Sequence, residues 1–124
     1  MATHTDIAGL LEEWIASLRT GRPERVVANY AEDAILIPTL SSQIRHTHSE
    51  IREYFEHFLE KEPEGRVEEQ NIRIYGDIAI NSGLYTFTVK GDGAPEEVRA
   101  RFTFVYRRSG EQWLIIEHHS SLLP

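Results

Sequence analysis

Two ionisable side chains near the end of the chain have the spacing of an acid–base pair. Glu117 and His119 lie two residues apart in a segment, Trp113 to Pro124, that begins with four large apolar residues and then becomes polar. In a strand, side chains at i and i+2 leave the same face, about 7 Å apart. Such a pair can transfer protons, or the carboxylate can orient the imidazole. The structural alternative, which carries more weight, is a polar cluster that anchors the chain end at a subunit contact.

The elements that must position this pair are long strands with a period-two pattern. Ile78 to Lys90 and Val98 to Arg108 precede the last strand, and Ser109-Gly110 is expected to close the final hairpin. This hairpin pairs Phe102 with Glu117, which gathers aromatic and ionisable side chains on one face. The residues expected to line a cavity on this face are Tyr85, Phe87, Phe102, Phe104, Glu117 and His119. A bulge in the last strand would shift the parity by one and exchange His118 with His119.

The opposite face of these strands is too apolar to be a bare solvent face. Its expected members are Leu84, Thr86, Arg101, Thr103, Val105, Leu114, Ile116 and His118. Large exposed apolar patches usually mark interaction sites, so the simplest expectation is that a second copy of the chain covers this face. The pattern therefore predicts a homodimer or a higher oligomer.

The first half of the chain is predicted to be mainly helical. Apolar residues at helical spacing indicate a helix over Asp6–Thr20, and Pro23 starts a second, short helix. Ala34–Ile37 is a short buried strand, and Thr47 begins a third helix, with a capping box to Glu50, that ends near Lys61. The order is helix, helix, strand, helix and then four strands in a meander. This order predicts a single α+β domain over residues 1–124, with one antiparallel sheet and helices on one of its faces.

The chain resembles members of the nuclear transport factor 2-like superfamily, and within it the small bacterial relatives of the association domain of calcium/calmodulin-dependent protein kinase II. The segments that carry the resemblance are Tyr30–Ala34, Ile51–Phe55, Gly83–Phe87, Arg101–Tyr106 and Trp113–Pro124. The last segment, with its Trp-x-Ile-x-x-His-His-Ser-Ser pattern ending in Pro, discriminates best. The resemblance implies a cystatin-like cone, in which a curved sheet wraps around a long helix, leaves a cavity at its open end and assembles through its outer face.

The chain also departs from the animal association domain, which has a pocket lined by arginines. The matching positions are Tyr85, Phe104 and Ser120, none of which is arginine. The binding of acidic small molecules that such a pocket implies is therefore not carried over. The catalytic sets of the enzymatic relatives, such as isomerases, dehydratases and cyclases, cannot be placed on this chain residue by residue.

The mouth of the expected cavity carries two arginines and an aromatic residue. Arg45 and Arg52 flank it and could hold an anionic ligand, and Tyr54 belongs to its wall. His46 and His48 form a His-x-His pair, but Thr47 is expected to cap a helix, which breaks the geometry of a chelate. We therefore expect no metal and no cofactor.

The composition restricts the classes of partner. A net charge of −7 argues against nucleic acid or an anionic membrane, because both require a basic surface. No cysteine is present, so disulfides and thiolate chemistry are excluded. The beginning of the chain lacks a signal pattern and no apolar run reaches spanning length, so a cytoplasmic protein is expected.

The leading functional interpretation is a homo-oligomeric association-type domain with a small-molecule-binding cavity. Two alternatives stay open. One is a cofactor-independent isomerase, dehydratase or cyclase that acts on a small hydrophobic substrate. The other is a scaffold or accessory subunit.

Overall fold

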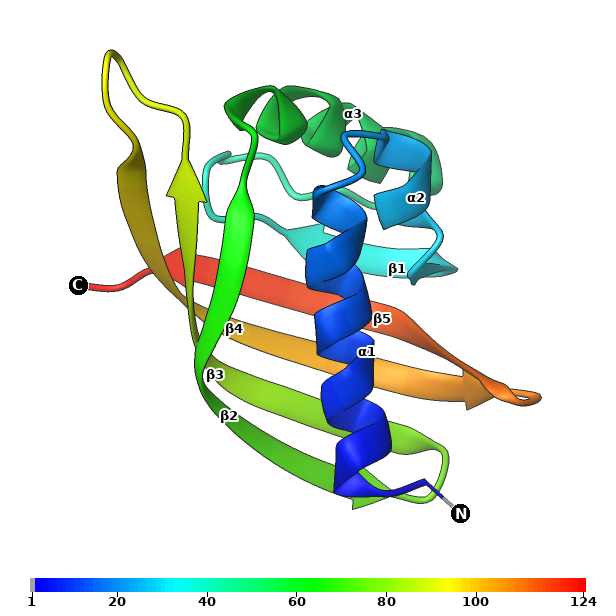
Figure 1. Ribbon diagram of the computed structural model, residues 1–124. Helices are drawn as coiled ribbons and strands as arrows, with labels where there is room; N and C mark the ends of the chain where they lie inside the picture. The colour runs from blue at the N-terminus through cyan, green and yellow to red at the C-terminus, as the bar shows by residue number, and fades with distance from the viewer. Residues whose placement is uncertain (1) are drawn as a thin grey trace.

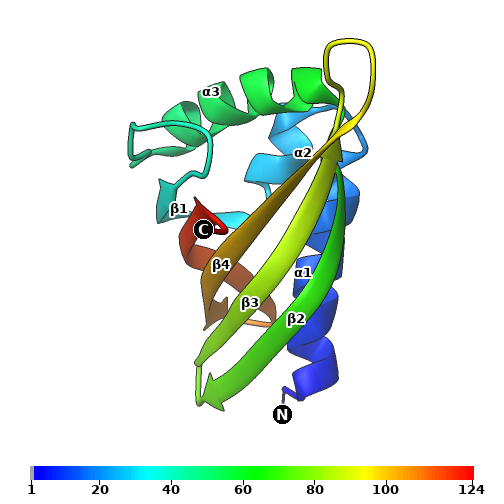
Figure 2. The same ribbon diagram turned by 90° about the vertical axis from the view of Figure 1, so that its left-hand side faces the viewer.

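A strongly bent sheet of five strands carries all the helices on one side, with α1 lying across it (Figures 1 and 2). The computed structural model describes residues 2–124. The elements in chain order are α1 (His4–Leu18), α2 (Pro23–Val27), β1 (Tyr30–Ile37), α3 (His48–Phe58), the 3-10 turn η1 (Leu59–Lys61), β2 (Glu64–Tyr75), β3 (Ile78–Val89), β4 (Glu96–Ser109) and β5 (Gln112–Leu122). This confirms the predicted α+β class with a curved sheet around helices.

The sheet is antiparallel except at one edge. The strand order is β1-β5-β4-β3-β2, and β2 to β5 form the predicted meander. β1 pairs with β5 in parallel, which corrects the prediction of a purely antiparallel sheet. The parallel pair arises because α3 and three strands separate β1 from β5 in the chain, which leaves room for a crossover.

Helix α1 supplies the centre of the core. Thr3 caps it, since its side chain accepts a hydrogen bond from Asp6 N–H while the Asp6 carboxylate accepts one from Thr3 N–H. This reciprocal cap starts the helix two residues before the predicted boundary. Trp14 is buried against the sheet, as predicted, stacked on Tyr85 at 5.9 Å and edge-on to Phe104 at 5.3 Å between ring centroids.

Helix α3 begins with half of the predicted capping box. The Thr47 side chain accepts a hydrogen bond from Glu50 N–H, but the Glu50 carboxylate accepts one from His46 N–H rather than from Thr47. The backbone hydrogen bond from His46 holds the pKa of Glu50 below its ordinary value. The cap therefore also ties down the loop that precedes α3.

The bend of the sheet has a local cause in β2 and β3. The register shifts between Val67 and Glu69, so one residue of β2 bulges out. Opposite this bulge, a Cβ atom at Gly83 would collide with the backbone oxygen of Glu69. Bulges increase strand twist and glycine permits a close backbone approach, so this pair allows the sheet to curl around α1.

No helix within residues 2–124 combines the length and the apolar character needed to span a membrane.

Candidate functional site

The register of the last hairpin differs from the predicted one at two places. The turn lies at Gly110 and Glu111, with Ser109 opposite Gln112, so Tyr106 pairs with Ile115 rather than with Trp113. The register then shifts once more, because Val105 pairs with Glu117, and Ile116 is an extra residue. The first change moves the pairing by two residues, so each side chain stays on the face of the sheet that was predicted for it. The bulge at Ile116 moves it by one residue and reverses parity.

The bulge exchanges the faces of the two histidines. His118 pairs with Phe104 and is 2% exposed, whereas His119 pairs with Thr103 and is exposed. Glu117 lies on the outer side with His119, opposite Val105. The predicted placement of Glu117 and His119 on the aromatic face is therefore wrong, and so is the placement of His118 on the outer face. The exchange that a bulge would cause is the one observed.

His118 is the centre of a buried chain of hydrogen bonds. Its Nδ1 atom lies 2.8 Å from Tyr30 Oη, and its Nε2 atom lies 3.1 Å from Tyr85 Oη. Trp14 Nε1–H donates to Tyr30 Oη at 3.1 Å, and Tyr85 O–H donates to Ser120 Oγ at 2.8 Å. Thr39 also donates to Ser120, from the loop that follows β1. The chain links α1, β1, β5 and β3 through their side chains.

The partners determine which nitrogen of His118 carries the proton. Because Tyr85 donates its hydroxyl proton to Ser120, its oxygen accepts from His118, so Nε2 is protonated. A neutral imidazole then accepts at Nδ1, and Tyr30 supplies the proton while accepting from Trp14. The hydrogen bonds of this network thus all run in one donor-to-acceptor direction, from Trp14 to Ser120.

Burial keeps the side chains of this hydrogen-bond network uncharged. Desolvation and, to a smaller extent, the nearby His119 lower the pKa of His118 to about 3. Desolvation also raises the pKa of Tyr30 and that of Tyr85 well above their ordinary value. The Phe104 ring stacks on the His118 imidazole at 3.9 Å between centroids, which completes its apolar surroundings. His118 therefore has neither a free nitrogen nor a suitable pKa for acid–base catalysis near neutral pH.

A small cavity adjoins Ser120 and the Tyr85 hydroxyl. Its volume is about 20 Å³, measured as the space open to the centre of a water molecule, which is enough for about one water. Its lining comes from α1, β1, the loop after it, α3 and the sheet: Trp14, Leu36, Pro38, Thr39, Leu40, Tyr54, Phe55, Phe58, Tyr85, Phe87, Val98, His118 and Ser120.

The predicted wall residues divide into two groups. Tyr54, Tyr85 and Phe87 line the cavity. Phe102 and Phe104 lie one layer behind it, where Phe102 stacks on Tyr85 and Phe104 stacks on His118. The prediction that these aromatic residues share one face of the sheet is therefore correct. Their rings pack against one another and fill most of the space that was expected to be a cavity.

The two predicted mouth arginines lie in different surroundings. Arg45 is 7% exposed and lines a groove between the loop after β1 and α3. The half-exposed Arg52 side chain instead pairs with Glu56 and Glu24. Arg52 is thus part of a surface ion-pair cluster and does not line the cavity or the groove.

The outer sheet face has the predicted apolar character with a changed membership. Its partly exposed residues are Ile35, Ile37, Ile80, Leu84, Thr103, Val105, Leu114 and Ile116. Thr86, predicted to contribute, is already fully buried within the chain and donates a hydrogen bond to Glu68. Arg101 is exposed, and Glu117 and His119 join this face in place of His118.

His46 and His48 have structural partners. His48 Nε2 lies 2.9 Å from the backbone oxygen of Tyr30, and His46 pairs with Glu50. Within residues 2–124, no three His, Cys, Asp or Glu side chains are grouped closely enough to hold a metal ion.

Sequence reasoning missed Trp14, Tyr30 and Ser120 as members of the hydrogen-bond network around a buried histidine. Each looked like an ordinary core or strand residue, and their meeting depends on a bulge. The only available signal was the His118-His119 doublet itself, since one of two adjacent strand residues must face inward.

The fold defines the class of protein. Crystal structures with the same architecture include one from Streptomyces avermitilis whose description proposes a dehydratase of the NTF2-like family, with 13% identity, TM-score 0.85 and coverage of 95% of this chain and 94% of that chain. Another is an uncharacterised cystatin-like protein from Caulobacter vibrioides, with 14% identity, TM-score 0.79 and coverage of 95% and 87%. At these identities the likeness shows the fold alone, an NTF2-like cone.

A narrower assignment follows from sequence similarity. Residues 3–124 match the family described as calcium/calmodulin dependent protein kinase II association domain. A crystal structure from Xanthomonas campestris, whose description proposes the same domain, shares 40% identity and a TM-score of 0.95, with coverage of 100% of this chain and 90% of that chain. A comparison with curated protein sequences finds no match. The chain belongs to the association-domain family, as its final segment indicated.

Proposed function

We propose that this domain functions by self-association through the outer sheet face, forming a homodimer or a higher oligomer. The observation that carries the proposal is the row of apolar residues on β3, β4 and β5 that all the helices leave uncovered, because they pack on the other side (Figure 2). Ile80, Leu84, Leu114 and Ile116 are its largest members on these strands. Membership of an association-domain family supports a second copy of the chain as the cover.

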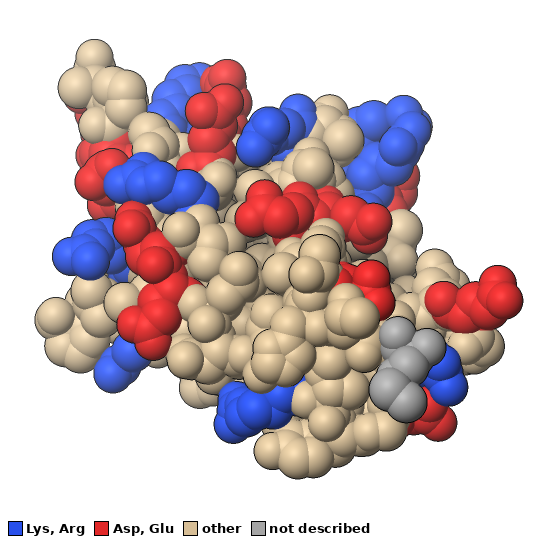
Figure 3. Space-filling model, turned by 60° about the horizontal axis from the view of Figure 1, so that its bottom comes forward, with Lys and Arg blue, Asp and Glu red and all other residues tan. Residues whose placement is uncertain are grey.

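The outer sheet face carries charges of both signs, since Arg101 of β4 and Glu117 of β5 lie on it. The same mixture is seen on the part of the surface in Figure 3, where Lys and Arg side chains are interspersed with Asp and Glu. Mixed charges permit two identical surfaces to approach, whereas a single-sign field would oppose it. A stable contact needs about 800 Å² of buried surface on each partner.

The proton-transfer alternative gains no support from the site. Glu117 and His119 lie outside the cone, and both nitrogens of His118 are occupied by tyrosine hydroxyls. The cavity beside Ser120 holds about one water, so it offers no room for a substrate in this conformation.

The test is the mass of the purified chain in solution. Sedimentation at micromolar concentration should give a multiple of 14.3 kDa. Ile116→Glu puts a charge into the proposed interface on the outer sheet face and should shift the mass toward that of the monomer. Tyr75→Glu is the matched control, because Tyr75 is 63% exposed at the β2–β3 hairpin, and it should leave the mass unchanged.

A monomer for the unmodified chain would overturn the proposal. Assembly only after addition of a different protein would favour the accessory-subunit alternative. An unchanged oligomer in both Ile116→Glu and Tyr75→Glu would show that assembly uses another surface.

A further inference from the structure

We infer that the Arg45 groove, formed by Leu40, Ser41, Arg45, Tyr54, His57, Phe58 and Lys61, binds a small organic molecule that carries a carboxylate on an apolar body. The groove lies between the loop after β1 and the outer side of α3. It borders the cavity beside Ser120, with which it shares Leu40, Tyr54 and Phe58, and it lies away from the outer sheet face, so the inference does not depend on the proposed function.

The first observation is an incompletely bonded buried cation. The Arg45 side chain is 8% exposed, and its Nη1 atom has no hydrogen-bond partner among the described residues. A buried, unpaired donor on a charged group is costly, so native structures rarely leave one without a purpose. A carboxylate that reaches Nη1 would supply the missing acceptor and a compensating charge.

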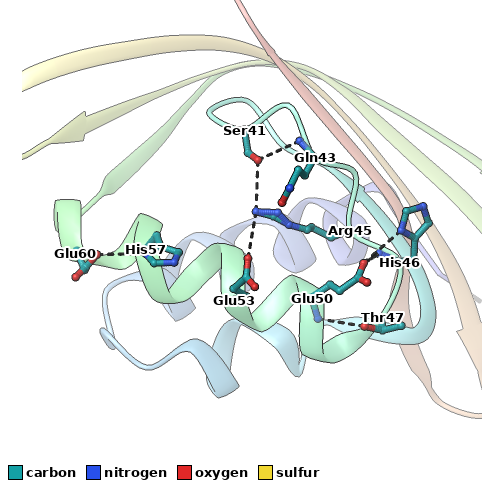
Figure 4. Close-up of polar contacts among 9 residues, drawn as sticks. All are labelled: Ser41, Gln43, Arg45, His46, Thr47, Glu50, Glu53, His57 and Glu60. Atoms are coloured by element: carbon teal, nitrogen blue, oxygen red, sulfur yellow. Dashed lines mark hydrogen bonds and ion pairs between the residues drawn. The ribbon is translucent and has the colours of Figure 1, made fainter.

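The second observation is that the existing partners of Arg45 are weak. Its Nη2 atom lies 3.4 Å from Ser41 Oγ and 3.8 Å from Glu53 Oε1 (Figure 4). Both distances are at the long limit of such contacts. The Glu53 side chain is 62% exposed, so water screens its charge. A ligand carboxylate could therefore replace or join these contacts at small cost.

The third observation is the charge of the lining. Arg45 and Lys61 are cations, whereas the lining holds no carboxylate. The nearest acidic partner of His57 is Glu60, 3.6 Å away on the exposed side of the helix (Figure 4). The Glu53 carboxylate reaches Arg45 only from the exposed rim, so the lining itself, with two cations and no carboxylate, attracts small anions.

The fourth observation is the apolar wall, which selects organic anions over inorganic ones. Leu40, Tyr54 and Phe58 line the groove, and the Arg45 guanidinium lies 5.5 Å from the centre of the Tyr54 ring. The groove has a volume of about 260 Å³, close to the lower end of small-molecule sites. Burial raises the pKa of Tyr54 to about 12, so its hydroxyl stays protonated and can donate a hydrogen bond.

The loop that carries Arg45 is anchored at its base and exposed at its tip. The backbone groups of Leu36 and Arg45 exchange two hydrogen bonds, of 3.0 and 2.9 Å, which close the loop at its base. Thr39 ties the loop to Ser120, and Leu40 stays 41% exposed at its tip. Because Nη1 itself is covered in this structure, the inference requires the Ser41 side of the loop to shift when the ligand binds.

The test uses benzoate as the probe and benzamide as its neutral isostere. Titration by calorimetry should show benzoate binding at least about tenfold more tightly than benzamide, because only benzoate pairs with the guanidinium. Amide shifts in two-dimensional NMR should change at Ser41, Tyr54 and Lys61 but not at Tyr85 or Ser120. Inorganic phosphate should bind more weakly than benzoate, because it cannot use the apolar wall.

Two variants and a control locate the effect. Arg45→Met keeps the apolar stem and should weaken benzoate binding about tenfold or more. Lys61→Met, at an exposed position, should weaken it about twofold to threefold. Arg52→Met makes the same change in net charge outside the groove and should leave binding within about twofold of the unmodified chain.

The inference is overturned if benzoate and benzamide bind equally, or if neither binds. It is also overturned if Arg52→Met weakens binding as much as Arg45→Met, or if the shifts fall on Tyr85 and Ser120. Should Arg45→Met fail to fold, Lys61→Met and the choice between benzoate and benzamide still decide the question.

Discussion

The Nδ1 atom of His118 lies 2.8 Å from the hydroxyl of Tyr30, so one side chain from β5 and one from β1 are joined across 88 residues of sequence. The two strands are also neighbours in the sheet. Trp14 of α1 donates to the same hydroxyl, and this makes Tyr30 a junction between the helix and the edge of the sheet.

His118→Gln should lower the free energy of unfolding by about 2–3 kcal/mol, because it leaves two buried tyrosine hydroxyls without their present partner. Urea denaturation measures this change. His57→Gln is the control, since the His57 side chain is 75% exposed, and it should change the free energy of unfolding by less than about 0.5 kcal/mol. Equal effects in the two variants would show that the buried network contributes no stability.

The stability of the chain should fall as the solution becomes more acidic, in part through His118. Its pKa is about 3 in the folded chain and near 6.5 when unfolded, so between these values the unfolded state binds more protons. The contribution is complete above about pH 6.5 and decreases as the pH falls toward 3. Between pH 7 and pH 5 the loss from this group is about 2 kcal/mol.

Denaturation curves at several pH values separate His118 from the other groups. The destabilisation caused by His118→Gln should shrink as the pH falls from 7 to 5, because the variant lacks the titrating group. A constant difference between the two proteins across this range would contradict the buried, neutral state of His118.

Nitrogen NMR should show the Nε2–H tautomer of His118. Long-range proton–nitrogen correlation spectra distinguish a protonated ring nitrogen from a bare one, and Nδ1 should be the bare atom at neutral pH. The reason is that Tyr85 donates onward to Ser120 and must accept from Nε2. The opposite tautomer, or an imidazolium, would contradict the donor and acceptor roles described for this hydrogen-bond network.

Gly83→Ala should destabilise the fold, because the new methyl group would collide with the backbone oxygen of Glu69 at the bulge of β2. We expect a loss of at least about 2 kcal/mol in the free energy of unfolding. Gly9→Ala in α1 is the matched control, since no atom lies within 4 Å of the added methyl group. It should stabilise the chain by about 0.5–1 kcal/mol, as alanine favours a helix interior. A neutral Gly83→Ala would mean that the sheet can relax its bend.

The sequence alone determined the elements and most of the core. The helical spacing of apolar residues located α1 with Trp14 inside, period-two patterns located β3 and β4, and a run of four apolar residues located the start of β5. These signals depend only on local geometry and on burial of apolar area. The final segment, with its paired histidines and serines, also indicated the association-domain family.

Only the tertiary structure decided which histidine faces inward. A strand pattern fixes the face of each side chain up to a single inserted residue, and the bulge at Ile116 is that residue. No local propensity marks it, because Ile116 is as good a strand former as its neighbours. The partial outward exposure of Ile116 and Glu117 and the burial of His118 result from the fit of β5 between β4 and β1, and that fit depends on contacts distant in sequence.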